Sequence, residues 1–107
     1  MEIIIKNRRA GKTTSLIKLC SETQYTIVCA NKKQVGYIGE VSIEMGINIP
    51  VPITFDEFVH KDYNDSIKGF LIDDADCFIQ QLTKVKITAM TLSNDLETMT
   101  TSLKKTL

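Results

Sequence analysis

The segment KNRRAGKTT, residues 6–14, decides the fold of this chain. It follows the short apolar run Glu2–Lys6, which predicts a strand, and it leads into Thr13–Glu22, where apolar residues recur at helical spacing. Gly11 permits a tight backbone turn, and the amides of the loop and of the first helical turn then point at a bound anion. Lys12 adds a positive charge, and the first helical residue adds a hydroxyl that suits a hard metal ion. The segment therefore predicts a phosphate-binding loop between a strand and a helix.

Outward from this loop, short β-rich runs alternate with helical patterns. The runs lack a polar–apolar alternation, which is typical of parallel strands covered on both faces. The order predicts an α/β fold, a three-layer sandwich with a mostly parallel sheet, in a single domain over residues 1–107. The first expected elements are a strand at Tyr25–Ala30, a helix capped by Asn31 and ended by Gly46, and an extended segment at Ile47–Phe55 that is either an edge strand or a loop. A short helix with a capping box at Thr54–Glu57, a polar loop at Lys61–Ser66, a strand at Gly69–Ile72 and a helical turn through Leu82 follow. The last elements are a strand at Val85–Leu92 and a helix capped by Asn94 that carries Leu96, Met99, Leu103 and Leu107 on one side.

The composition excludes several classes of protein. Lys plus Arg and Asp plus Glu each number 13, so the net charge is zero and a strongly basic nucleic-acid coat is excluded. No apolar run approaches the roughly 20 residues of a membrane span, so we expect no membrane association. Cys20, Cys29 and Cys77 fit neither a zinc pattern nor a disulfide framework, which favours reduced thiols in the cytoplasm.

The segment 6–14 resembles the Walker A loop of P-loop NTPases, G-x-x-x-x-G-K-[ST], with Lys6 at the position of the first glycine. Phage terminase ATPases are similar in this respect. The resemblance implies a nucleotide ligand and Mg²⁺ as the cofactor, with Lys12 on the β and γ phosphates and Thr13 on the metal. The motif leaves ATP and GTP as alternatives, and the lack of a guanine-reading N-K-x-D motif favours ATP. The implied nucleotide-binding residues are Asn7, Arg8, Arg9, Ala10, Gly11, Lys12, Thr13 and Thr14. For the two arginines, the alternatives are a solvated loop, contact with nucleic acid, or a finger that reaches a neighbour's site.

The segment FLIDDAD, residues 70–76, resembles the Walker B motif of helicases, terminases and AAA-type ATPases, and implies a minimal RecA-like core. In that family, the first acid holds Mg²⁺ and the second, a glutamate, polarises the attacking water. The resemblance therefore implies that Asp73 is a metal ligand. It also implies that Asp74 is a catalytic residue, in addition to Lys12. Because aspartate is one methylene shorter than glutamate, we expect slow hydrolysis. The alternative is a polar turn whose aspartates cap the next helix.

The family resemblance also implies a sensor of the γ-phosphate after the strand at Val85–Leu92. Thr91, Ser93 and Asn94 are the candidates, and the alternative is an ordinary strand end and helix cap. No arginine follows Arg9, and we expect neither a fifth core strand nor a second lobe. A transition-state arginine contributes about 10³–10⁵ in rate where it is used. A homo-oligomer, a protein partner that supplies such a finger, or DNA or RNA would then complete the site.

Three functions follow from these motifs. The first is a Mg²⁺-dependent ATPase, weakly active alone, that works with nucleic acid or a partner that handles it, as expected of a phage-encoded protein in the host cytoplasm. The second is a nucleotide-binding module without hydrolysis, which acts in assembly or as an inhibitor. The third is a nucleoside kinase, because thymidine kinases share the GKT loop and an acidic strand end followed by a phenylalanine, here Phe78.

Overall fold

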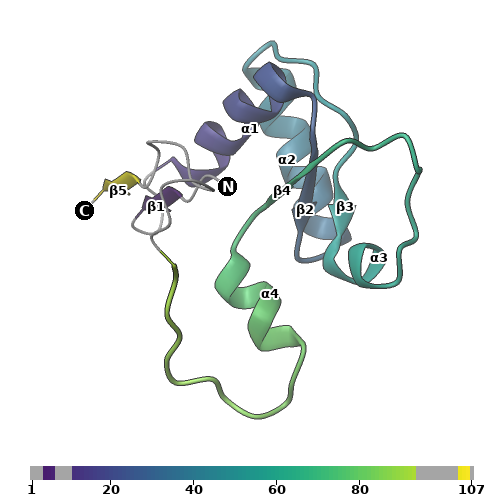
Figure 1. Cartoon of the computed structure of the whole chain (residues 1–107). Helices are drawn as coiled ribbons and strands as arrows, with labels where there is room; N and C mark the ends of the chain where they lie inside the picture. Colours follow the sequence, from purple (N-terminus) through teal and green to yellow (C-terminus); the bar gives the residue numbers. More distant parts are fainter. Residues whose placement is uncertain (1–3, 7–10, 94–103, 107) are drawn as a thin grey trace. The chain divides into compact units, whose positions relative to one another are not determined.

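A computed structural model of the 107-residue chain describes residues 4–6, 11–93 and 104–106 (Figure 1). The chain divides into two compact units. One comprises residues 1–12 and 87–107, and the other comprises residues 13–86. In the part of the chain that the structure describes, no helix has the length and apolar character needed to cross a membrane.

The unit of residues 13–86 is built on a three-stranded sheet in which every pair is parallel. Its strands are β2 (Thr26–Cys29), β3 (Ile53–Thr54) and β4 (Phe70–Ile72), in the order β3-β2-β4. The described residues form the helices α1 (Lys12–Thr23), α2 (Lys32–Glu44), α3 (Phe55–Val59) and α4 (Ala75–Gln81) (Figure 1). The prediction of an α/β fold with a parallel sheet is confirmed, and β3 lies at the edge of the sheet, one of the two alternatives predicted for that segment.

Local signals place the ends of the helices as predicted. Asn31 is the N-cap of α2, and its side chain accepts a hydrogen bond of 2.9 Å from the amide of Gln34. Gly46, just beyond α2, has a φ of +69°, a left-handed conformation that favours glycine. Thr54 and Glu57 form the expected capping box at the start of α3.

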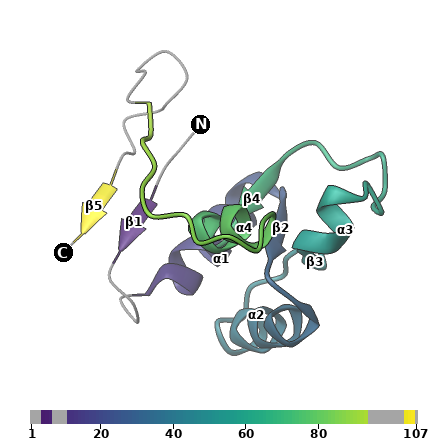
Figure 2. The same cartoon turned by 90° about the horizontal axis from the view of Figure 1, so that it is seen from below.

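The core of this unit joins α1 and α2 to one face of the sheet. Ile17 and Cys20 of α1 pack with Ile27 and Cys29 of β2 and with Ile38 of α2. Figure 2 shows α2 beside β2 and β3. All four residues of β2 are buried, which explains why this run lacks a polar–apolar alternation.

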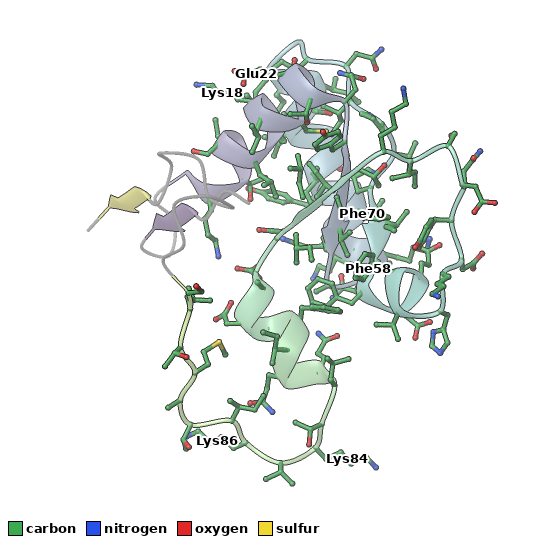
Figure 3. All side chains as sticks on the ribbon, viewed as in Figure 1. Lys18, Glu22, Phe58, Phe70, Lys84 and Lys86 are labelled. Atoms are coloured by element: carbon green, nitrogen blue, oxygen red, sulfur yellow. The ribbon has the colours of Figure 1, made fainter. Side chains whose placement is uncertain are left out.

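Aromatic side chains of α3 and α4 pack together against the sheet. Phe70 is aligned with Thr26 in the ladder, so strand alternation places its side chain on the face opposite Ile27. The centroids of the Phe58 and Phe70 rings are 4.9 Å apart, and Figure 3 shows the two rings turned toward each other. Phe78 of α4 extends the cluster through a contact of 5.7 Å with Phe58.

The second unit holds a two-stranded parallel sheet of β1 (Ile4–Lys6) and β5 (Lys104–Thr106), in which Ile4 is aligned with Lys104. The prediction of a helix that continues to the end of the chain is therefore wrong at residues 104–106. Pairing with a distant strand overrides the helical spacing of apolar residues there, because tertiary context outweighs local propensity. Asn94 and the rest of the predicted helix lie outside the described residues.

The prediction of a strand at Val85–Leu92 is also wrong. Residues 83–93 contain no helix or strand. Val85 and Leu92 are 74% and 58% exposed, so this run has neither a described ladder partner nor a buried face. β-Propensity without cross-strand contacts does not hold a strand.

Candidate functional site

The candidate site lies at the carboxyl edge of the three-stranded sheet. There the amide of Asp73 donates a hydrogen bond of 2.9 Å to the carbonyl of Val28, which continues the ladder one residue beyond β4. Asp73 is only 5% exposed. Strand alternation places its side chain on the same face as Leu71, which packs against the core that α1 and α2 cover. The first acid of the predicted motif is therefore a buried carboxyl group at the end of a parallel strand.

The amino end of α1 points toward the same edge. Two residues link α1 to β2, and the Cys20 thiol near the end of the helix donates a hydrogen bond of 3.0 Å to the Tyr25 carbonyl just before β2. The helix therefore runs back along the strand, with Thr13 and Thr14 toward its carboxyl end. Free amides and the helix dipole favour an anion at such an end.

Gly11 has a φ of +82°, just before the start of α1. This left-handed conformation strains any residue with a Cβ, which agrees with the prediction that a glycine is needed at this turn. Lys12 is the first residue of α1, and Thr13 and Thr14 follow it in the first turn.

The structure leaves other predicted residues without a test. Asn7, Arg8, Arg9, Ala10 and Asn94 lie outside the described residues. Thr91 and Ser93 are exposed and belong to no helix or strand. The predicted strand end that would carry a sensor is therefore not formed at these two residues.

Asp74 has the most unusual backbone at the strand end. It adopts a left-handed conformation (φ 54°, ψ 58°) between β4 and α4. Aspartate tolerates this conformation better than most residues, although it costs more there than glycine. Asp74 occupies the N-cap position of α4, but its side chain accepts no capping hydrogen bond. The side-chain cap that the alternative expects is therefore not formed by Asp74, although the residue does lie at the start of α4.

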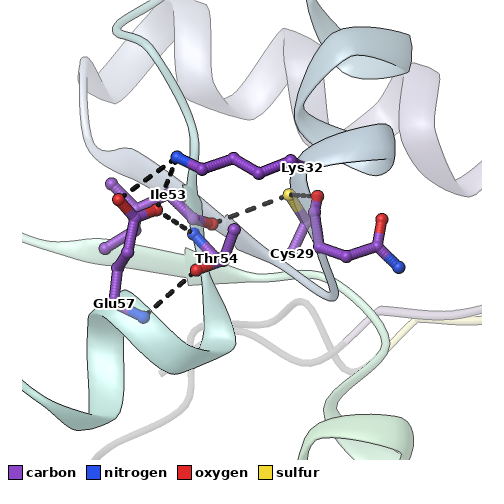
Figure 4. A network of polar contacts seen from close by, with 6 residues as sticks. Cys29, Lys32, Ile53, Thr54 and Glu57 are labelled. Atoms are coloured by element: carbon purple, nitrogen blue, oxygen red, sulfur yellow. Dashed lines mark hydrogen bonds and ion pairs between the residues drawn. The ribbon is translucent and has the colours of Figure 1, made fainter.

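Cys29 lies near Asp73, because the residues just before them, Val28 and Ile72, are aligned in the ladder. Its thiol donates a hydrogen bond of 3.6 Å to the carbonyl of Ile53 (Figure 4). Burial, and then the negative charge of Asp73, raise the pKa of the Cys29 thiol to about 11. The thiol is therefore neutral at physiological pH and acts as a small packing group next to the acid.

A polar network fixes the neighbouring corner of the sheet (Figure 4). The Glu57 carboxylate accepts a hydrogen bond of 2.9 Å from the Thr54 amide, and the Lys32 ammonium lies 3.3 Å from both of its oxygens. The Thr54 amide, and after it the Lys32 ammonium, hold the pKa of Glu57 below its usual value. The capping box was predictable from its spacing. The ion pair was not, because Lys32 and Glu57 are 25 residues apart.

An open pocket of about 370 Å³ lies at the opposite, amino edge of the sheet, lined by residues 23–26 and 66–68. One of its walls is Tyr25, whose ring covers Gly69 just before β4, so that an added Cβ at Gly69 would lie 2.8 Å from three ring atoms. This pocket includes none of the predicted site residues.

No group of three or more His, Cys, Asp or Glu side chains suited to a metal ion is found among the described residues. Mg²⁺ often uses only one or two protein carboxylates together with substrate phosphates. The carboxylate of Asp73 and the hydroxyl of Thr13 are oxygen donors of the kind that Mg²⁺ prefers, so their chemistry fits this ion.

Comparisons with protein-family models, with curated proteins and with solved structures found no match.

Proposed function

We propose that the chain is a Mg²⁺-dependent, ATP-binding P-loop ATPase with a minimal RecA-like core, weakly active by itself. The observation that carries this proposal is the buried Asp73 at the carboxyl edge of a parallel sheet, the edge toward which the amino end of α1 also points. Open α/β sheets bind ligands at this edge. The left-handed Gly11 just before α1 supports a phosphate loop at the start of that helix.

The proposed roles follow from the chemistry of each group. The amides at the start of α1 and the Lys12 ammonium would bind the phosphates, and the Thr13 hydroxyl and the Asp73 carboxylate would hold Mg²⁺, which would neutralise phosphate charge. Asp74 orients water for attack on the γ-phosphate. Because its side chain is short and no arginine follows Arg9 in this sequence, we expect slow turnover.

Isothermal titration calorimetry with Mg²⁺ and ATP tests the binding. We expect Lys12→Ala to weaken binding by about tenfold or more, which corresponds to about 1.4 kcal/mol. Lys18→Ala is the control, since it removes an exposed lysine of the same helix (Figure 3). Lys18 lies outside the phosphate-loop segment 6–14, so this variant should keep the affinity for ATP within about twofold. Equal affinities for the wild type and Lys12→Ala would show that the phosphate loop is not used.

Phosphate release from ATP, with and without added DNA or RNA, tests the catalysis. We expect slow release that nucleic acid or a partner accelerates, and we expect Asp74→Asn to abolish it. Asp76→Asn removes an exposed acid from the first turn of the same α4 and should retain it. Loss of activity in both variants, or in neither, would contradict the role of Asp74.

A nucleotide-binding module without hydrolysis is the second candidate. The aspartate at position 74, in place of glutamate, favours it because the carboxylate reaches less far from a constrained backbone. Tight binding of Mg²⁺ and ATP without phosphate release, even with nucleic acid present, would select this function over the first.

A further inference from the structure

We draw no further inference here: the strongest candidate, the exposed apolar stripe of Ile72, Ala75, Ile79 and Leu82 along the end of β4 and one side of α4, carries none because nothing in the described part of the structure shows what covers it.

Discussion

Replacing Glu57 by alanine tests the network that fixes the corner of the sheet next to the candidate site. The substitution removes the acceptor of the Thr54 amide, at 2.9 Å, and the ion pair with Lys32, at 3.3 Å. Thr54 is 6% exposed, so its amide would lose a partner where water reaches poorly, at a cost of about 1–3 kcal/mol. The Lys32 side chain is 75% exposed, and the ion pair therefore adds about 0–1 kcal/mol.

We expect Glu57→Ala to lower the free energy of unfolding by about 2 kcal/mol, measured by urea denaturation. For a domain of this size, that corresponds to a fall in Tm of roughly 10 °C. Asp56→Ala is the matched control, because it removes an acid from the same helical turn without touching the capping box. Glu57→Gln keeps an acceptor for the amide and should lose about 1 kcal/mol or less. If Glu57→Ala and Asp56→Ala unfold at the same urea concentration, the network does not stabilise the fold.

The same network predicts a dependence on pH. Because folding lowers the pKa of Glu57, its contribution is complete above the ordinary glutamate value of 4.5 and is lost as the pH falls through the lower folded value. The difference in stability between the wild type and Glu57→Ala should therefore be constant near pH 7 and shrink below about pH 4.5. A difference that grows on acidification would contradict this account of the carboxylate.

Two further predictions concern packing and thiol chemistry. Gly69→Ala places a Cβ 2.8 Å from the Tyr25 ring and should destabilise the fold by about 1–3 kcal/mol, whereas Gly36→Ala, in α2 with no atom within 4 Å of the new Cβ, should stabilise it by about 0.5–1 kcal/mol. Urea denaturation measures both, and equal stability of the two variants would refute the packing around Tyr25. Because burial raises the pKa of Cys29, iodoacetamide at pH 8 should modify the exposed Cys77 in the native protein and reach Cys29 only after unfolding. Peptide mass spectrometry measures this order, and equally fast labelling of both thiols would overturn the burial of Cys29.

Signals within a few residues of each other predicted much of the local structure. The side-chain cap of Asn31, the capping box of Thr54 and Glu57, and the glycines at positions 11 and 46 act through bonds or dihedral angles that involve neighbouring residues. Such preferences are already present in the chain before it folds. The buried strand at Thr26–Cys29 was also predictable from its own residues, because a strand that is covered on both faces is apolar along most of its length.

Only the tertiary structure decided which segments found partners. Val85–Leu92 has strand-forming residues but no described ladder partner, whereas Lys104–Thr106 pairs with Ile4–Lys6 against its helical pattern. For the candidate site, the sequence by itself determined the residue types, Lys12 and Thr13 at a strand-to-helix turn and Asp73 at a strand end. The fold determined that Asp73 is buried beside Cys29 and that Lys32 reaches Glu57. Burial and long-range pairing depend on contacts between segments that are far apart in the sequence. A short stretch of sequence does not determine such contacts.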